Sequence, residues 1–481
     1  MEEYRGRNRW QVGLLSGALA VAVVAAGGAY ALSRQLSGGG TQPEDVLRSG
    51  AVALAKVDLD PSLGQKLAVW QLSQKFPEAF NASSKDTVLS ESVVNALLRG
   101  TPLSYATDVK PWLGDRAAIA VYPAPRKGAN PELAFALQYT DLTAMTAALQ
   151  KLDNSRHISW ATRDGYVVVA EQPEQASAVL ATDDAHAMSA QDSYRSDIAT
   201  LGGDQLALGW ADAAGLSAAE LATIAHAATG TGADLLHSAL AAKAVPSSGR
   251  IVVGLHADSS YLELVGRTLG AKGGGVAHSA GHDLAGAMPA DSLAAISVTD
   301  VGAASSRISS LLGAEPAVGA AVKGLDKRYG LNVSGLLGAI FGKETAVALG
   351  PMHAKTPDVT LRTSGGNAKQ VTSILGLLTA MVGDKFAKLR RTADGFVIGN
   401  NPNEVKAAAG TGHPLADIAA FKSAVPDAGG AGLVAYANIV GLIAQGVIAP
   451  ADAKGLEHVQ AVGLSSSGGD SPQFRLRLTV D

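Results

Sequence analysis

The chain repeats one pattern of segments in the same order, and this repeat limits what it can fold into. Leu113–Val121 matches Phe341–Leu349, about 228 residues later, and Asp164–Val168 matches Asp394–Ile398. Further matches are Tyr194–Ser196 with Phe421–Ser423 and Asp212–Leu216 with Asn438–Leu442. The offsets stay between 226 and 230 residues and the order is kept, which indicates duplication of one structural unit.

Within each copy the periodicity alternates between that of strands and that of helices. Ala117–Tyr122 and Leu133–Tyr139 predict strands, and Asp164-Gly165 predicts a tight hairpin turn. Leu63–Phe76 predicts a helix, because apolar residues recur there at mostly helical spacing. Asp141 is placed to cap a second helix with Leu142, Met145, Leu149 and Leu152 on one face. Hairpins joined by helices predict an α+β fold, in which a mainly antiparallel sheet carries helices on one face in each of two tandem repeats.

The N-terminal segment predicts export from the cytoplasm. Residues 1–10 contain three arginines, residues 11–32 carry no charge, and Arg34 follows. About 20 apolar residues are needed to cross a bilayer as a helix, and the flanking charges place the N-terminus in the cytoplasm. We therefore expect a single-pass transmembrane helix over 11–32, in contact with the lipid bilayer. The alternatives are a signal peptide cleaved near Ala31, which also exports the chain, and a buried soluble helix.

These features predict a domain organisation with an extracytoplasmic bulk. Ser37–Pro43 is rich in glycine, and a second glycine-rich run covers Gly270–Gly275. The predicted parts are a cytoplasmic N-terminus (1–10), a transmembrane helix (11–32), a flexible tether (33–48), a first α+β repeat (49–270), a glycine-rich linker (271–287) and a second α+β repeat (288–481).

Composition and motifs exclude several functions. The absence of Cys excludes a thiolate metal site and a cysteine nucleophile, and a net charge of −4 argues against nucleic acid as a partner. The sequence contains no phosphate-binding loop, no G-x-S-x-G, no S-x-x-K and no H-E-x-x-H. Aromatic residues make up 5% of the chain, which disfavours a stacked sugar-binding platform. We therefore predict no cofactor and no catalytic activity.

Asp58 and Asp60 straddle Leu59 at the end of a predicted strand, so both carboxylates point to one side. They could form an acid/base pair or contribute to a calcium site. The structural alternative is a turn in which Asp60 caps the next helix.

The segment around Trp112, Asp115 and Arg116 could dock a partner, because Trp and Arg are frequent in interface hot spots. The structural alternative is a buried Trp beside a turn, in which Gly114 takes a positive φ. His278 and His282, with Asp283 adjacent, have a metal-like spacing, but the surrounding glycines favour a solvated linker.

Three segments carry a resemblance to a known family: Lys56–Ser62, Lys75–Glu78 and Asp108–Arg116. Together they resemble domain-of-unknown-function family 3352, membrane-anchored bacterial proteins common in actinobacteria. The resemblance covers most of the chain after the tether and is sharper in the first copy, since Ala339-Ile340 stands where Pro111-Trp112 would be expected. The family has no assigned activity, so the resemblance implies the topology and no functional residues.

Three function classes remain open. The first is a non-enzymatic cell-envelope protein that holds or recognises another protein. The second is an extracytoplasmic carrier of a lipid or other apolar ligand, which needs a cavity lined by aliphatic side chains. The third is an enzyme with scattered carboxylates that no motif reveals. The sequence favours the first class over the carrier, and the carrier over the enzyme.

Overall fold

A computed structural model of the chain divides into two compact units, Met1–Gly274 (unit 1) and Gly275–Asp481 (unit 2). The residues that the structure describes are 40–58, 63–76, 101–126, 131–213, 215, 248–270, 283–299, 342–353, 356–369, 371–372, 388–449, 453–468 and 471–481.

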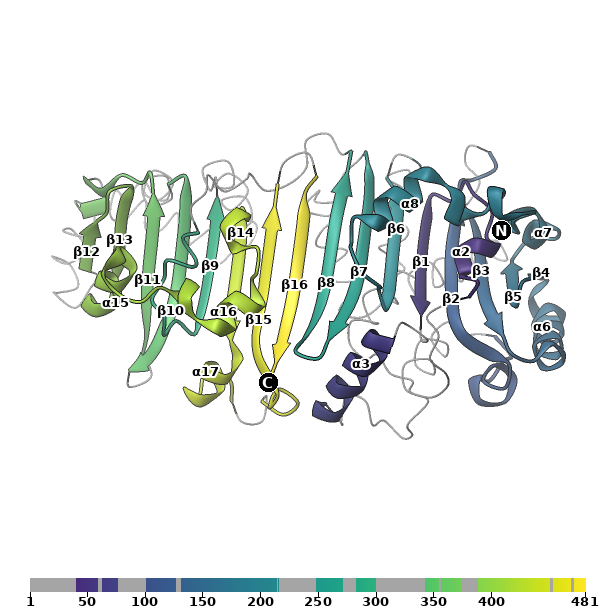
Figure 1. Ribbon diagram of the computed structural model, residues 1–481, viewed down its shortest axis with the longest axis horizontal. Coiled ribbons are helices and arrows are strands. Elements are labelled where there is room, and N and C mark those ends of the chain that lie inside the picture. The colour runs from purple at the N-terminus through teal and green to yellow at the C-terminus, as the bar shows by residue number, and fades with distance from the viewer. Residues whose placement is uncertain are drawn as a thin grey trace, which may run out of the picture. The chain divides into compact units, whose positions relative to one another are not determined.

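The strands of unit 1 pair antiparallel in the order β8-β7-β6-β1-β2-β3-β5-β4 (Figure 1). Their bounds are β1 (Ala53–Asp58), β2 (Leu113–Tyr122), β3 (Glu132–Tyr139), β4 (Ser159–Arg163), β5 (Tyr166–Ala170), β6 (Ala207–Asp212), β7 (Arg250–Asp258) and β8 (Tyr261–Leu269). The turn between β4 and β5 is the predicted hairpin, with φ of 49° at Asp164 and 82° at Gly165.

Short helices cover both faces of this sheet. They are α2 (Pro43–Val46), α3 (Leu63–Lys75), α6 (Leu142–Arg156), α7 (Gln175–Val179) and α8 (Asp192–Ala199), with single turns at Tyr105–Val109, Asp184–His186 and Met188–Ala190. The Asp141 side chain accepts a hydrogen bond from the Ala144 amide, as the predicted cap requires. Met145 and Leu149 of α6 then pack against Val167 and Val169 of β5. The opposite face, at Val168, packs under α2, α7 and α8.

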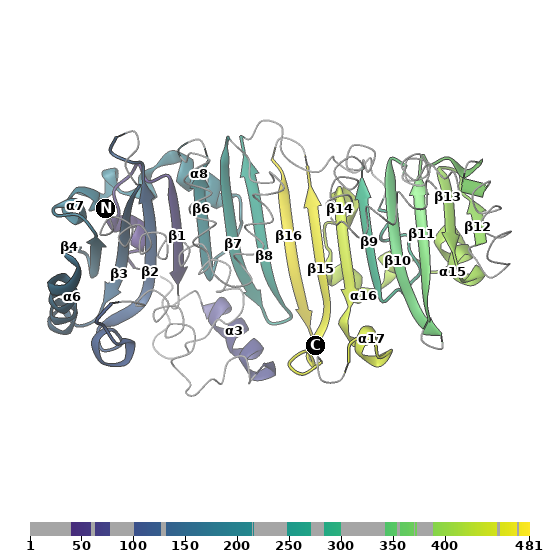
Figure 2. The same ribbon diagram turned by 180° about the vertical axis from the view of Figure 1, so that it is seen from behind.

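The strands of unit 2 pair antiparallel in the order β12-β13-β11-β10-β9-β14-β15-β16, which Figure 2 shows from behind. Their bounds are β9 (Ala294–Thr299), β10 (Glu344–His353), β11 (Thr356–Ser364), β12 (Lys388–Arg391), β13 (Gly395–Gly399), β14 (Leu433–Asn438), β15 (Val459–Ser467) and β16 (Gln473–Val480). The helical segments are α15 (Pro402–Lys406), Ala407–Thr411, Leu415–Asp417, α16 (Ala419–Ala424), Ala428–Gly430 and α17 (Ile439–Ala444).

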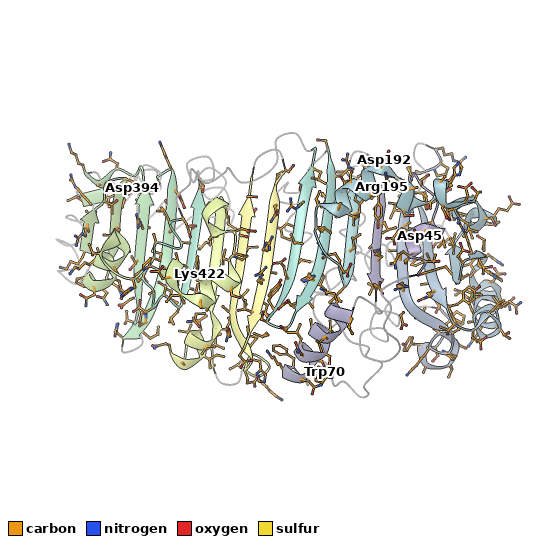
Figure 3. All side chains as sticks on the ribbon, viewed as in Figure 1. Asp45, Trp70, Asp192, Arg195, Asp394 and Lys422 are labelled. Atoms are coloured by element: carbon orange, nitrogen blue, oxygen red, sulfur yellow. The ribbon has the colours of Figure 1, made fainter. Side chains whose placement is uncertain are left out.

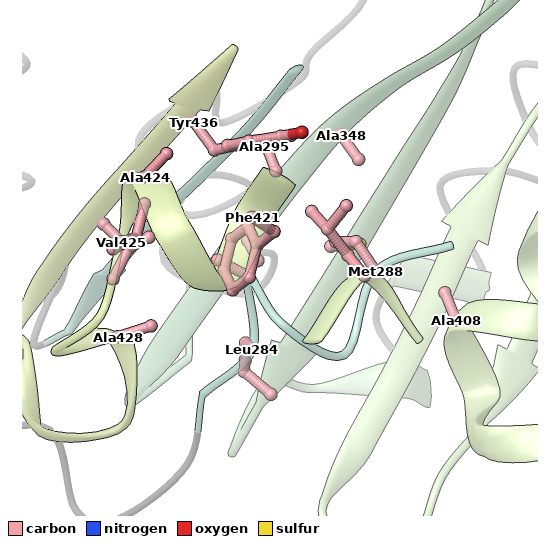
Figure 4. Packing of buried hydrophobic residues seen from close by; sticks show 14 of the residues in the cluster. Leu284, Met288, Ala295, Ala348, Ala408, Phe421, Ala424, Val425, Ala428 and Tyr436 are labelled. Carbon is pink, nitrogen blue, oxygen red and sulfur yellow. The ribbon is translucent and has the colours of Figure 1, made fainter. Parts of the chain in front are cut away.

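Both units use one strand order: counted from the first strand of each, the spatial order 4-5-3-2-1-6-7-8 is the same. The matched sequence segments lie on equivalent elements, among them strands β2 and β10 and helices α8 and α16. An edge-to-face ring pair also recurs. Tyr194 and Trp210 lie 5.8 Å apart in unit 1, and Phe421 and Tyr436 lie 5.1 Å apart in unit 2. Figure 4 shows Phe421 in the core of unit 2, where Leu284 and Met288 pack from the segment before β9.

The predicted fold class, α+β with a transmembrane helix ahead of two sheet-plus-helix repeats, is wrong. Antiparallel sheet dominates both units, and the longest helix among the described residues, α6, has 15 residues. Each helix covers only part of a sheet face, so the helices form no layer of their own. In the described part of the chain, no helix has the length and apolar character to span a membrane. Residues 11–32, on which that prediction rested, lie outside the described residues.

Two segments assigned to connections belong to the folded units instead. Of the predicted tether, residues 43–46 form α2, and Val46 and Leu47 are fully buried. Of the predicted linker, Leu284 and Ala285 are buried in the core of unit 2. In both places an apolar pair next to glycines packs on the sheet, so glycine content alone was a poor guide to flexibility.

Candidate functional site

The predicted residue Asp58 forms an ion pair with Arg116. They are direct register partners on β1 and β2, and the Arg116 Nε donates to the Asp58 Oδ2 at 3.1 Å. The two side chains are 14% and 5% exposed, so the pair is largely desolvated. A carboxylate held by a guanidinium is a poor general base, and Asp60, its expected partner, lies outside the described residues.

A second buried ion pair lies on the same face of the sheet. Lys56 of β1 pairs with Glu44 of α2, and the Tyr194 hydroxyl donates to the Glu44 Oε1 at 3.3 Å. Burial and the Glu44 carboxylate both raise the pKa of Tyr194. These polar contacts hold α2 against the sheet.

Residues 40–48, called here the docked segment, are fixed by their backbone as well. The Tyr166 hydroxyl donates to the Thr41 carbonyl at 2.9 Å, and burial raises the pKa of Tyr166. The Met188 amide donates to the Leu47 carbonyl, and the Arg48 amide to the Val179 carbonyl, each at 2.8 Å. The chain that follows the predicted export segment is therefore built into unit 1 from residue 40 onward.

The predicted docking loop is divided between the two faces of the sheet. Trp112 is 2% exposed in the core beneath α6, and its Nε1 donates to the Asp108 carbonyl at 2.6 Å. Arg116 points to the other face and pairs with Asp58, which leaves Asp115 alone exposed. Trp112 and Arg116 are therefore both buried, on opposite faces of the sheet, and form no shared exposed surface for a partner.

Gly114 does not have the positive φ expected from the sequence. Instead, a Cβ at this position would lie 2.8 Å from the Gln138 Cγ, and the Gln138 Oε1 accepts from the Asp115 amide at 3.1 Å. Close packing of Gln138 across the strand pair, rather than a special backbone angle, explains the glycine.

The candidate metal ligands give no site in the described residues. His278 and His282 lie outside them. The Asp283 Oδ1 accepts a hydrogen bond from the Gly286 amide at 2.7 Å, and burial raises the pKa of Asp283. Among the residues that the structure describes, no group of three or more His, Asp or Glu side chains is arranged to hold a metal ion.

The surface of α3 is the feature that sequence reasoning missed. Leu63, Leu67 and Trp70 are 59%, 51% and 43% exposed, at positions i, i+4 and i+7 of one helical face. Figure 3 labels Trp70 on this helix. We call these three residues the α3 stripe. Helical spacing correctly predicted the helix, but it could not say which face is buried, because apolar residues occur on both faces.

The other face of α3 is fixed to the sheet. Ala68, Val69 and Leu72 are buried, and the Gln65 side chain makes two hydrogen bonds to the backbone of Ala257 in β7, each of 3.0 Å. The pairing of β7 with β6 ends before Ala257, so the amide and carbonyl of Ala257 have no partner in β6. The Gln65 side chain supplies the missing hydrogen bonds. The helix cannot rotate to bury the α3 stripe without breaking this contact.

Comparison with known proteins identifies the family and nothing more specific. The comparison with curated proteins gave no match, and neither did the comparison with solved structures. The family model of DUF3352, described as a protein of unknown function, matches residues 14–392, which is most of the chain. The chain therefore belongs to the DUF3352 family of proteins of unknown function.

Proposed function

We propose that this chain is a non-enzymatic, extracytoplasmic interaction protein that binds another protein through the α3 stripe. The observation that carries the proposal is the exposure of Leu63, Leu67 and Trp70 on a helix whose other face is already seated. Exposed apolar residues that gather on one face are typical of interaction sites, whereas scattered ones need no explanation.

The occupant that fits best is a protein with an apolar groove. The α3 stripe is a convex ridge with i, i+4 and i+7 anchors, which is the pattern by which a helix inserts into a partner's groove. Trp70 gives this ridge a large apolar side chain of the type enriched in hot spots. The proposal assigns no reaction, since the described carboxylate of the predicted acid/base pair, Asp58, is held by Arg116.

The location outside the cytoplasm is part of the same proposal. It is supported by the three arginines within residues 1–10 and by the uncharged, mainly apolar residues 11–32 that follow. Alkaline phosphatase fused after Asp481 is active only outside the cytoplasm, so it should be active, and green fluorescent protein at the same site should not fluoresce. The reverse result would place the bulk of the chain in the cytoplasm. The mass of the mature chain distinguishes an uncleaved N-terminus from cleavage near Ala31.

Site-specific photocrosslinking in intact cells tests the interaction. A benzophenone amino acid replaces Leu67 in the full chain, and in a matched control it replaces Leu142, which is 54% exposed on α6. We expect a discrete protein adduct from position 67 that Trp70→Asp removes, and no such adduct from position 142. Equal adducts from both positions, or none from position 67, would contradict the proposal. A lipid adduct would favour the carrier function, and an adduct with a second copy would indicate self-association.

A further inference from the structure

The edge strand β12 of unit 2 carries a run of exposed cations. Lys388, Arg390 and Arg391 are exposed, whereas Leu389 is half-buried. In the described part of the chain, β12 pairs with β13 and with no other strand, and it lies at the end of the sheet of unit 2 (Figure 1). The outer edge of such a strand presents unpaired backbone groups, which another extended chain can join.

These cations lie on both faces of the sheet. Arg390 is the register partner of Val397, which packs in the core of unit 2 on the face that α15 covers. Arg391 is the register partner of Phe396, which packs on the opposite face. Lys388 lies two positions before Arg390 and therefore on the same face as Arg390. A strand added in the plane of the sheet lies beside all three cations, whereas a flat surface covering one face would reach only some of them.

The cations of β12 form no ion pair with an acidic side chain of the described residues. The acidic residue that follows most closely, Asp394, instead accepts a hydrogen bond from the Thr392 hydroxyl at 2.8 Å. Helix α15, which contacts β12, exposes a further cation, Lys406, and buries its acidic residue, Glu404. The positive charge of this edge is therefore available to a partner, and charge complementarity favours an acidic one.

The equivalent edge of unit 1 differs in charge. Strand β4 has the same place in the strand order as β12, but its sequence, Ser-Trp-Ala-Thr-Arg, contains one cation. That residue, Arg163, is paired with Asp164 through its Nε at 2.9 Å and with Asp184 through its Nη2 at 2.5 Å. Charged residues on an edge strand can also prevent aggregation. Since β4 ends its sheet without unpaired cations, the fold does not require them, and recognition of a partner accounts for those of β12.

We propose that β12 binds an extended acidic segment of another protein, which joins the outer edge of β12 as a further strand. Backbone hydrogen bonds hold the added strand, and its acidic side chains lie across from Lys388, Arg390 and Arg391 and fix its register. This edge lies in unit 2 and shares no residue with the α3 stripe of unit 1, so the two surfaces can be tested separately.

A synthetic peptide with the core Glu-Glu-Val-Glu matches β12 in antiparallel register. Its glutamates lie opposite Arg391, Arg390 and Lys388, and its valine lies opposite Leu389. Fluorescence polarisation of the labelled peptide, titrated with the full chain in a neutral detergent, measures binding. We expect saturable binding that weakens as salt is added. A peptide with Gln in place of Glu should bind about tenfold more weakly, because three cross-strand charge pairs are lost.

Substitutions in the chain test the cations themselves. The triple variant Lys388→Gln, Arg390→Gln and Arg391→Gln should also bind the peptide about tenfold more weakly than the wild type. A control variant with the same change of net charge should bind as the wild type does. It replaces three exposed lysines elsewhere: Lys110→Gln, Lys343→Gln and Lys422→Gln. An equal loss in both variants would indicate non-specific attraction and would overturn the proposal.

Methylation of the peptide backbone tests strand addition on the wild-type chain. In an extended strand, the amides of alternate residues point to the same edge. Two peptides of the same charge carry N-methyl groups on one alternating set of residues or on the other. We expect one set to abolish binding, since those amides donate to β12, and the other set to leave binding largely intact. Equal binding of both peptides would mean attraction by charge alone, which contradicts strand addition.

Two further results would overturn the proposal. The first is the absence of saturable binding by the unmethylated peptide, and aggregation of the triple variant in that case would assign the cations to protection of the edge. The second is binding of polyphosphate, an anion without a peptide backbone, by a chain that does not bind the peptide. That result would assign the edge to an anionic polymer.

Discussion

Units 1 and 2 have the same strand order, but the polar residues at equivalent positions on their strands differ. Opposite each other on β1 and β2, unit 1 has Asp58 and Arg116, and the equivalent pair on β9 and β10 is Thr299 and Glu344. Lys56 opposite Ala118 corresponds to Ser297 opposite Ala346. Positions that are apolar in one unit are mostly apolar in the other. The order of strands therefore depends on the shared apolar pattern, while the buried polar residues differ.

The buried polar residues differ because a different kind of segment covers the sheet in each unit. In unit 1, Glu44 in the docked segment pairs with Lys56 of the sheet. In unit 2 the segment before β9 contributes Leu284, Ala285 and Met288, and its polar tie is the Leu284 amide, which donates to the Glu344 Oε1 at 3.1 Å. Both covering segments pack apolar side chains on their sheets, but unit 1 adds a buried ion pair, whereas unit 2 adds a hydrogen bond from a backbone amide.

The largest effect that separates the units should come from Arg116→Ala. It removes the cation opposite Asp58 in a desolvated site, which should destabilise unit 1 by about 3–5 kcal/mol. All five tryptophans lie within residues 1–274, so tryptophan fluorescence during urea unfolding reports unit 1. The double variant Arg116→Ala with Asp58→Ala serves as the control and should recover much of the loss. A single variant as stable as the wild type would show that the pair does not hold unit 1.

A pH titration should change unit 2 more than unit 1. Burial raises the pKa of Glu344 to about 7, so its stabilising contribution is complete below about pH 4.5 and is lost as pH rises through 7. The slope is bounded by one proton, about 1.4 kcal/mol per pH unit. Hydrogen exchange in β10 should follow this slope in the wild type and lose most of it in Glu344→Gln. An equal slope in β2 would remove the contrast between the units.

Tyr194→Phe gives unit 1 the residue type that unit 2 has at the equivalent position, Phe421. The ring contact with Trp210 is kept, and only the hydrogen bond to Glu44 is lost. We expect a loss of about 1–2 kcal/mol in unit 1, read by tryptophan fluorescence. A loss as large as that of Arg116→Ala would mean that the Tyr194 hydroxyl, rather than the ion pairs, holds the docked segment.

Asp115→Ala should have the smallest effect. The side chain is exposed, so solvent weakens the contacts that it makes, and the hydrogen bond to Gln138 comes from its backbone amide, which alanine keeps. Stability should stay within about 0.5 kcal/mol of the wild type in the same urea assay. A larger loss would assign Asp115 a structural role that its exposure does not indicate.

Local features were predictable from the sequence because their causes are local. The Asp164-Gly165 turn and the Asp141 cap were confirmed, since each depends on residues a few positions apart. The helix predicted to start at Leu63 was confirmed for the same reason. Its exposed face was not predictable, since that depends on where β6 stops pairing with β7 and on Gln65 reaching Ala257.

The candidate site was less predictable because its contacts are long-range. The sequence singled out Asp58 and Arg116 separately, but their pairing depends on strand register between residues 58 positions apart. Burial of charged groups by distant strands leaves no periodic signal in the sequence.

The shared strand order can be tested by disulfide formation, since the chain has no native cysteine. Ala53 and Ala211 are register partners on β1 and β6, and Ala294 and Ala437 are the equivalent partners on β9 and β14. Both cysteine pairs should oxidise readily, because direct partners in an antiparallel pair lie within disulfide range, whereas Val57→Cys with Ala211→Cys should not. Oxidation of one equivalent pair but not the other would contradict a common fold for the two units.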